Sequence, residues 1–308
     1  MTILFSHEAA RAHRTPLGHP ERPERMQAVQ DALAPEAFAV LDRRSPEPAS
    51  LETVALAHPE EWVRAMVKAA PAEGLVHVDS DTVLSPGTID CVLRGVGAVV
   101  AGVDAVMARE ARNVFSAMRP PGHHAERTRA MGFCLFNNAA IAARHARVVH
   151  GAERVAIVDW DVHHGNGSQD IFWDDPSVLF CSTHQMPLYP GTGAVSEAGE
   201  HDTIVNAPLK PGADGERFRE AFEARVLPRL RDFRPDLIVI SAGFDAHWRD
   251  PLANLMLEAE DFAWATRQVM AIADQACDGR IVSVLEGGYD LRGLGESTAA
   301  HVAALMEA

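Results

Sequence analysis

The sequence predicts an α/β fold in which a parallel sheet is covered by helices on both faces. Short apolar runs rich in β-branched residues alternate with longer segments of helical periodicity along the chain. The apolar runs are continuous, whereas a strand with one face in water would alternate apolar and polar residues. Turn-forming residues bound most of these runs. Strands and helices in this alternating order build a layered α/β domain.

Five segments have the composition of buried strands. They are residues 114–118, 155–159, 178–182, 237–241 and 281–285. Four helices are expected over residues 86–107, 137–149, 216–233 and 258–277. The first is expected to begin with Ser85 as its N-cap and Pro86 at its first helical position. Gly151 and Gly279 stand just beyond the second and fourth helices, where glycine commonly ends a helix.

Length and composition indicate a globular protein. The 308 residues are 47% hydrophobic and 23% charged, without internal repeats or a long linker. The proline-rich residues 44–50 are interpreted as a surface loop, so a single domain over residues 1–308 is expected. A formal charge of −15 argues against direct nucleic-acid binding, which needs a basic surface. It weakly favours cationic substrates such as amines or basic peptides, although an acidic surface also serves solubility.

The cysteines and the apolar segments indicate a cytoplasmic protein. Four widely spaced cysteines without a C-x-x-C pattern are expected to be reduced and mostly buried. The N-terminus lacks the basic and apolar regions of a signal peptide. Nowhere do about 18 apolar residues follow one another, so no transmembrane helix is expected.

Four of the predicted strands are followed by glycine-containing turns that carry histidine, aspartate or tyrosine. The turns read RPPGHH after residues 114–118, WDVHHGNG after 155–159, AGFDAH after 237–241 and EGGYD after 281–285. In open parallel sheets, ligands bind at the carboxyl ends of the strands. These turns should therefore meet at one edge of the sheet and form the functional site there.

The turn after residues 155–159 predicts a metal site. Asp159, Asp161 and His163 alternate along an extended segment and so share a face. Two buried carboxylates and an imidazole this close are stable only around a cation, whereas an exposed acidic loop would need none. Asp245 is a plausible third ligand, although it could also cap a helix. Such a ligand set leaves a position open for water and suits Zn²⁺, Fe²⁺, Co²⁺ or Mn²⁺.

Two further turns carry acid–base chemistry. His123 and His124 follow a Pro-Pro-Gly turn and are predicted to act as general acid or base near the metal. Tyr289 lies in a Gly-Gly-Tyr turn, from which its phenol could donate a hydrogen bond to a polarised carbonyl. The other histidines lack a partner pattern and are expected on the surface, among them His58, His77, His145 and His201.

Taken together, these motifs resemble the histone deacetylase family. The matching segments are HPERPER at 19–25, RPPGHH at 119–124, DWDVHHGNG at 159–167, CSTHQ at 181–185, YPGTG at 189–193, SAGFDAH at 241–247, DPL at 250–252 and LEGGYDL at 285–291. They follow the family's order and are most similar to class II and bacterial histone deacetylase-like amidohydrolases. The resemblance implies the three-layer arginase–deacetylase fold, with an eight-stranded parallel sheet between helices.

The resemblance also implies a role for each residue of the site. It makes Asp161, His163 and Asp245 the zinc ligands, with Fe²⁺ or Co²⁺ as possible replacements. It makes His124 the general base and then acid, beside His123, and it places Tyr289 on the scissile carbonyl. Asp159 would hold His123, and Asn166 stands where class I members carry an aspartate behind His124.

A potassium site and a substrate tunnel follow from the same resemblance. The potassium ligands would come from Asp159, Asp161, His163, Ser182 and Thr183, several of them through backbone carbonyls. The tunnel walls would include Gly132, Phe133, Tyr189 and Leu252, with Arg25 in an internal channel behind the metal. Ordinary core packing would explain Phe133 and Leu252 equally well.

The predicted function is a zinc-dependent amidohydrolase that removes acyl groups from amines, with acetyl-lysine side chains as the expected substrate. An acetylpolyamine amidohydrolase is the first alternative; Leu252, where a eukaryotic polyamine-selective relative has glutamate, argues against it. A catalytically idle acyl-lysine-binding scaffold is the second, and the intact catalytic positions argue against that. The tandem histidines and the Gly-Gly-Tyr turn disfavour an arginase-type enzyme. The sequence leaves the oligomeric state open.

Overall fold

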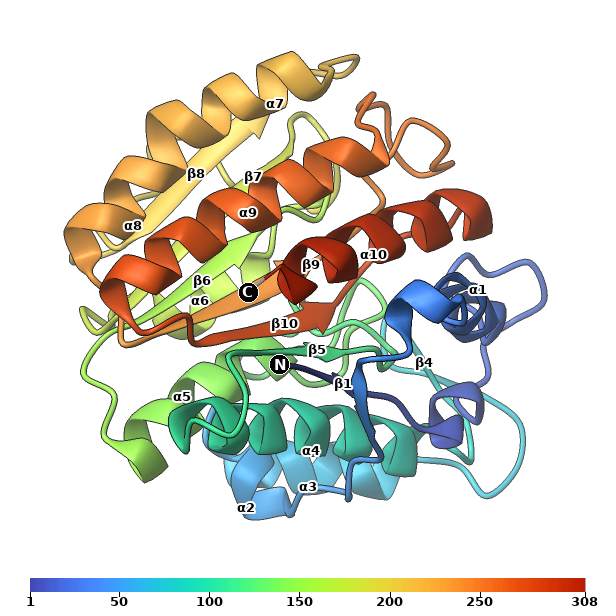
Figure 1. Ribbon diagram of the computed structural model, residues 1–308. Helices are drawn as coiled ribbons and strands as arrows, with labels where there is room; N and C mark the ends of the chain where they lie inside the picture. Colours follow the sequence, from blue (N-terminus) through green and yellow to red (C-terminus); the bar gives the residue numbers. More distant parts are fainter. Residues whose placement is uncertain (308) are drawn as a thin grey trace.

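The computed structural model describes residues 1–307 and is organised around an eight-stranded sheet (Figure 1). Its strands lie in the order β2-β1-β5-β10-β9-β6-β7-β8, and all neighbouring strands are parallel. Their bounds are β1 Thr2–Phe5, β2 Asp42–Arg44, β5 Asn113–Ser116, β6 Val155–Asp159, β7 Val178–Gln185, β8 Ile204–Leu209, β9 Leu237–Ala242 and β10 Ile281–Leu285. A short antiparallel pair, β3 (Val76–His77) and β4 (Val83–Leu84), stands apart from this sheet. The predicted eight-stranded parallel sheet is confirmed.

Helices cover both faces of the sheet, which gives the predicted three layers (Figure 1). One face carries α4 (Thr88–Met107) and α5 (Asn138–His150), with the short helices α2 (Leu51–Val54) and α3 (Glu60–Ala69) beside them and α6 (Asn166–Phe172) against α5. The other face carries α1 (Glu24–Ala32), α7 (Gly215–Ala221), α8 (Leu227–Phe233), α9 (Ala259–Ala276) and α10 (Leu291–Met306). Because both faces are covered, every residue of β5, β6, β7, β9 and β10 is buried.

The five predicted strands are the five central strands of the large sheet; its other three strands, and the separate pair β3 and β4, were not predicted. β1 is only four residues long, and β2 is an edge strand with the polar sequence Asp-Arg-Arg. β8 forms the opposite edge and contains Pro208, which a central strand would not tolerate. The edge strands β2 and β8 lack the continuous apolar run by which buried strands are detected, and the internal strand β1 is too short to show one.

Two helix predictions need correction. α4 begins at Thr88, because the hydroxyl of Ser85 accepts the N–H of Arg14 and does not cap the helix. The segment predicted as one helix over 216–233 contains a π-helical stretch at Phe222–Val226 between α7 and α8. Pro228 follows directly, and widening the preceding turn relieves the clash between its ring and the helix backbone.

The predicted surface position is wrong for two of the four histidines named above, and also for His13 and His301, which are buried. His58 and His145 are buried, whereas His77 and His201 are exposed. His58 Nδ1 lies 3.2 Å from the carbonyl oxygen of Arg127, its Nε2 accepts the N–H of Asn137, and burial lowers its pKa to about 4. These two partners are distant from His58 in sequence, so no local sequence pattern predicts that His58 is buried. The four cysteines are buried and unpaired within residues 1–307, and no helix there is long and apolar enough to cross a membrane.

Candidate active site

The predicted site residues meet at the carboxyl edge of the sheet. His123 and His124 follow β5, Asp161 and His163 follow β6, Asp245 follows β9 and Tyr289 follows β10. These four strands are neighbours in the order β5-β10-β9-β6. Parallel strands present their carboxyl ends on one side, so four turns far apart in sequence enclose one space.

Asp161, His163 and Asp245 form a buried cluster that could hold a cation. One ligand atom from each residue lies within 4.8 Å of the other two. His163 Nδ1 is 3.2 Å from Asp161 Oδ1 and 3.1 Å from Asp245 Oδ2. Backbone N–H groups orient both carboxylates: that of Gly287 donates to Asp161 Oδ2, and that of Val162 donates to Asp245 Oδ1, each at 2.8 Å.

The electrostatics of this cluster favour positive charge at its centre. Although burial disfavours a charged ring, the hydrogen bonds and charges of Asp161 and Asp245 raise the pKa of His163 to about 10. Burial and the charge of Asp161 raise the pKa of Asp245 above its ordinary value. The two buried carboxylates therefore favour a positively charged group between them. One imidazole and two carboxylates are a donor set that suits a divalent transition metal.

Gly287 is required next to this cluster. A Cβ at this position would lie 2.1 Å from Asp245 Oδ2 and 2.6 Å from Asp161 Oδ2, closer than any real contact. Glycine lets the backbone N–H approach the carboxylates directly. The close approach of this backbone to the two carboxylates thus explains why the residue after Glu286 in the EGGYD turn is glycine.

His124 is held in one neutral tautomer. Its Nδ1 lies 2.7 Å from Asn166 Oδ1, while Asn166 Nδ2 donates to Glu126 Oε1 at 2.7 Å. Because the carboxylate of Glu126 can only accept, it fixes the amide with its oxygen toward His124, and Nδ1 of His124 carries the proton. Burial, together with the neighbouring His123 and His163, holds the pKa of His124 well below its ordinary value. Nε2 is therefore an unprotonated base at neutral pH.

His123 has the opposite electrostatics. Its Nδ1 donates to Asp159 Oδ2 at 2.9 Å, and its Nε2 is 3.7 Å from Asp161 Oδ2. Burial disfavours the charged ring, but the charges of Asp161, Asp159 and Glu286 outweigh it and raise the pKa of His123 well above its ordinary value. The two adjacent imidazoles, with ring centroids 4.0 Å apart, therefore differ in charge.

A cavity of about 220 Å³ opens onto these side chains. It is lined by Asp81, His124, Gly132, Phe133, His163, Leu188, Tyr189, Leu252 and Tyr289. The predicted wall residues Gly132, Phe133, Tyr189 and Leu252 are all among them, whereas Asp81 and Leu188 were not predicted. Tyr189 is 39% exposed, which places it at the mouth. The lining is mainly apolar away from the reactive groups, as in a pocket for an uncharged chain.

Comparison with known proteins identifies the family. Residues 19–305 match the histone deacetylase domain. The chain belongs to the histone deacetylase family. It is 41% identical over 299 residues to a probable deacetylase of Archaeoglobus fulgidus, covering 95% of this chain and 82% of the relative. A histone deacetylase-like amidohydrolase of Pseudomonas aeruginosa is 40% identical over 277 residues, covering 88% and 73%.

Comparison with solved structures confirms the arginase–deacetylase fold. The crystal structure of the HDA15 HD domain superimposes with a TM-score of 0.93 at 34% sequence identity, covering 99% of this chain and 89% of that one. The histone deacetylase motifs quoted from the sequence therefore lie on the expected fold.

In this histone deacetylase domain, Arg25 lies behind Tyr289 and outside the cavity lining. Its guanidinium is fully buried, donates to the carbonyl oxygens of Glu286 and Gly288, and lies 5.0 Å from the centroid of the Tyr289 ring. Asp250 Oδ2 accepts the backbone N–H of Tyr289 at 2.7 Å. The Gly-Gly-Tyr turn is thus held from two sides.

Ser182 and Thr183 lie in β7, beside Asp159 at the end of β6. The hydroxyl of Ser182 is 2.9 Å from His184 Nδ1. The buried hydroxyl of Thr183 has no hydrogen-bond partner within residues 1–307. An unpartnered buried hydroxyl is costly unless a further group binds it.

The sequence interpretation missed several residues that support the site. Glu286 accepts the N–H groups of Gly122 and His123, and Glu126 orients Asn166. Farther back, the buried carboxylate of Glu21 binds the guanidinium of Arg119. Glu286 opens the EGGYD turn after a buried strand, so its position carried a signal. Glu21 lies in the HPERPER segment quoted above but was given no role, and Glu126 has no local pattern that distinguishes it from a surface charge.

Proposed function

We propose that this protein is a metal-dependent amidohydrolase that removes acyl groups from amines, preferentially from acetyl-lysine side chains. The observation that carries the proposal is one narrow cavity lined by His163 of the three-residue cluster, the neutral His124 and the phenol of Tyr289. Membership of the histone deacetylase family supports deacylation as the reaction.

Asp161, His163 and Asp245 would hold the metal, for which we propose Zn²⁺, with Fe²⁺ or Co²⁺ as functional replacements. A divalent metal at this position supplies Lewis-acid chemistry, because it polarises an amide carbonyl and lowers the pKa of water. We further propose a structural K⁺ near Asp159, Ser182 and Thr183. The unpartnered hydroxyl of Thr183 supports this second ion.

The side chains divide the remaining chemistry. His124 Nε2 is unprotonated and accepts the proton of the attacking water, and then delivers it to the leaving amine. Tyr289 donates a hydrogen bond to the oxygen of the scissile carbonyl as charge develops there. His123, held by Asp159, contributes positive charge beside His124, which lowers the pKa of His124 and keeps its Nε2 unprotonated until water attacks the carbonyl.

Acetylated polyamine is the second candidate substrate, and Asp81 is the observation that favours it. Its carboxylate belongs to the cavity lining, where it could attract a second ammonium group. Leu252 lines the same cavity and favours an uncharged neighbourhood, as around the side chain of an acylated lysine. Direct comparison of substrates decides between them.

The function is tested by measuring turnover on acetyl-lysine peptides, acetylated polyamines and small acylamides, with metal content determined on the same sample. We expect highest kcat/KM on the peptides, loss of activity on chelation and recovery with Zn²⁺. Asp245→Asn should lose the metal of this cluster and the activity, whereas Asp232→Asn at an exposed position should keep both. Absence of amide hydrolysis with Zn²⁺, Fe²⁺ and Co²⁺ alike would refute the proposal.

Replacing Tyr289 with phenylalanine should lower kcat by about 10²–10³, the cost of removing one donor to a developing oxyanion. KM should change much less, because the ring and its packing remain. Tyr189→Phe at the cavity mouth is the matched control and should remain close to wild type. Full activity in the Tyr289 variant would exclude the assigned role.

Replacing Asn166 with aspartate should shift the acidic limb of the kcat/KM profile to higher pH. A carboxylate in place of the amide stabilises the charged imidazole and should raise the pKa of His124. His124 then loses its proton, and becomes a base, only at higher pH. Asn254→Asp adds the same charge at an exposed position and should leave the limb in place. An unchanged limb in the Asn166 variant would mean that another group controls it.

Three statements remain predictions from the sequence: a single domain over residues 1–308, a cytoplasmic location and the lack of direct nucleic-acid binding. The proposed partners are acylated amines.

A further inference from the structure

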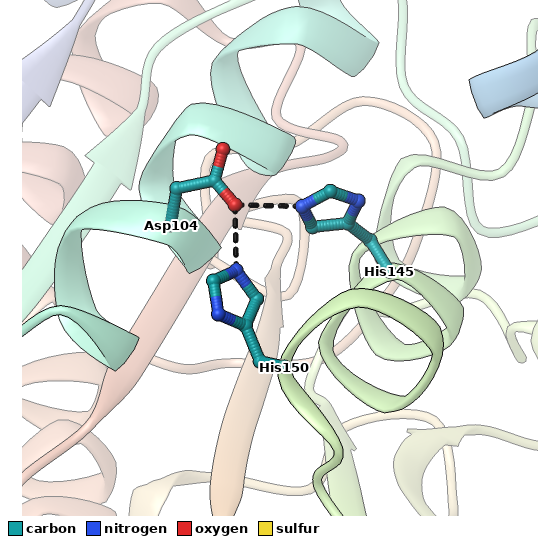
Figure 2. A group of neighbouring side chains, drawn as sticks. All are labelled: Asp104, His145 and His150. Carbon is teal, nitrogen blue, oxygen red and sulfur yellow. Dashed lines mark hydrogen bonds and ion pairs between the residues drawn. The ribbon is translucent and has the colours of Figure 1, made fainter.

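A second group of metal-ligand side chains lies between α4 and α5 (Figure 2). Asp104 comes from α4, and His145 and His150 come from the last turns of α5; all three point toward one another. The Nε2 atoms of both histidines lie 2.7 Å from the same Oδ1 of Asp104. One ligand atom of each residue lies within 4.8 Å of the other two.

This group is separate from the active site. α4 ends at Met107 and α5 ends at His150, shortly before β5 and β6 begin. The group therefore lies toward the amino-terminal edge of the sheet, whereas the catalytic turns follow the carboxyl ends of the same strands. The roles proposed for His124, Tyr289 and the Asp161 cluster do not use it.

We propose that Asp104, His145 and His150 form a second binding site for a divalent transition metal such as Zn²⁺. Two imidazoles and one carboxylate are the ligands that zinc and its neighbours prefer, whereas Mg²⁺ and Ca²⁺ prefer oxygen alone. Three protein ligands leave the fourth tetrahedral position to water.

The geometry requires little rearrangement. Bonds of about 2.0–2.1 Å to zinc separate tetrahedral ligand atoms by about 3.3 Å, only slightly more than the present 2.7 Å contacts. Each histidine would move its remaining proton to Nδ1, so that both Nε2 lone pairs point inward. Two packed helices hold the ligands in place, so binding orders few additional groups.

The site is open to solvent on one side. The side chain of Asp104 is 51% exposed and that of His150 is 24% exposed, whereas that of His145 is 10% exposed and anchors the group. Asp104 also lines a surface cavity of about 390 Å³, through which an ion can enter. A bound metal would join α4 to α5, the two long helices on one face of the sheet.

Metal stoichiometry tests the proposal. Protein stripped with a chelator is dialysed against Zn²⁺, and bound metal per chain is measured. We expect two Zn²⁺ in wild type and one in His150→Gln and Asp104→Asn, both of which should keep wild-type kcat. Asp245→Asn should also bind one, and the Asp245→Asn/His150→Gln double variant none. His201→Gln, an exposed histidine outside the group, is the matched control and should bind two.

The outcomes separate this proposal from that of the catalytic metal. Equal stoichiometry in wild type and His150→Gln overturns the second site, since the group is then only a hydrogen-bonded helix contact. Wild-type stoichiometry of one that is lost in His150→Gln but kept in Asp245→Asn supports the second site and refutes the catalytic one. A further readout is the visible spectrum of Co²⁺-loaded protein, in which one of two components should disappear in His150→Gln.

Discussion

Replacing His124 with alanine is expected to lower kcat by about 10²–10⁴, the usual contribution of a positioned general acid–base group. His124 is the buried imidazole whose Nδ1 is occupied by Asn166 and whose Nε2 is unprotonated. The same atom would take the proton of water and return it to the amine, so both halves of the reaction lose their proton carrier. Steady-state kinetics on an acetyl-lysine peptide measure the effect.

Metal content distinguishes loss of the base from loss of the site. Because His124 is outside the cluster of Asp161, His163 and Asp245, the alanine variant should bind as much catalytic metal as wild type. His201→Ala, an exposed position, serves as the control and should have wild-type kcat. Wild-type kcat in the His124 variant would show that another residue is the general base. If the variant had lost the catalytic metal, its low kcat would reflect the missing metal and not the missing proton carrier.

Replacing Glu21 with glutamine should lower the free energy of unfolding by about 3–5 kcal/mol, because it leaves a buried guanidinium without its counter-ion. Glu21 and Arg119 are both fully buried and joined by two hydrogen bonds, with Arg25 Nη1 3.2 Å and His13 Nε2 3.6 Å away. Nη1 of Arg119 is already used by the carbonyl oxygens of Ala10 and His13. Urea unfolding at pH 7 measures the loss.

The same pair predicts a pH dependence. Burial alone would raise the pKa of Glu21, but the charge and hydrogen bonds of Arg119, with His13 and Arg25, lower it from 4.5 to about 2. A carboxyl whose pKa is lower in the folded state than in the unfolded state stabilises the folded protein at pH values above its unfolded pKa. That stabilisation, about 3 kcal/mol, should be complete above pH 4.5 and disappear as the pH falls toward 2.

The stability difference between wild type and Glu21→Gln should therefore narrow over this interval. Glu60→Gln removes the partner of Arg64 from an ion pair in which both side chains are 58% exposed, and it should change stability little at any pH. A constant difference between wild type and Glu21→Gln from pH 5 to pH 2.5 would mean that Glu21 is not the titrating group.

The sequence predicted the central sheet and the turns of the site because both leave local patterns. A strand buried on both faces must be continuously apolar, as β6 and β10 are, and a reactive turn must follow it directly. β2 and β8 were not predicted because an edge strand does not need a continuous apolar run. The π-helical stretch at Phe222–Val226 lies just before Pro228, and the apolar periodicity of the segment does not reveal it.

The supporting contacts of the site could not be predicted for a different reason. Glu126 orients Asn166 across 40 residues, and Asp250 holds the backbone of Tyr289 across 39. Each is a charged residue in a loop, and its partner is fixed only by the assembled fold. His145 was wrongly expected on the surface because Asp104, its partner, lies 41 residues earlier on another helix.

Because the backbone N–H of Gly287 binds Asp161, the geometry of the cluster depends on strands from distant parts of the chain. Asp161 and His163 follow β6, Asp245 follows β9, and the N–H that orients Asp161 comes from the turn after β10. A fragment ending at residue 280 would keep every proposed ligand and still lack β10 and this turn. Such a fragment should bind Zn²⁺ only weakly at the cluster. During synthesis, therefore, the cluster can reach its final geometry only after the ribosome has made residues 281–287, near the end of the 308-residue chain.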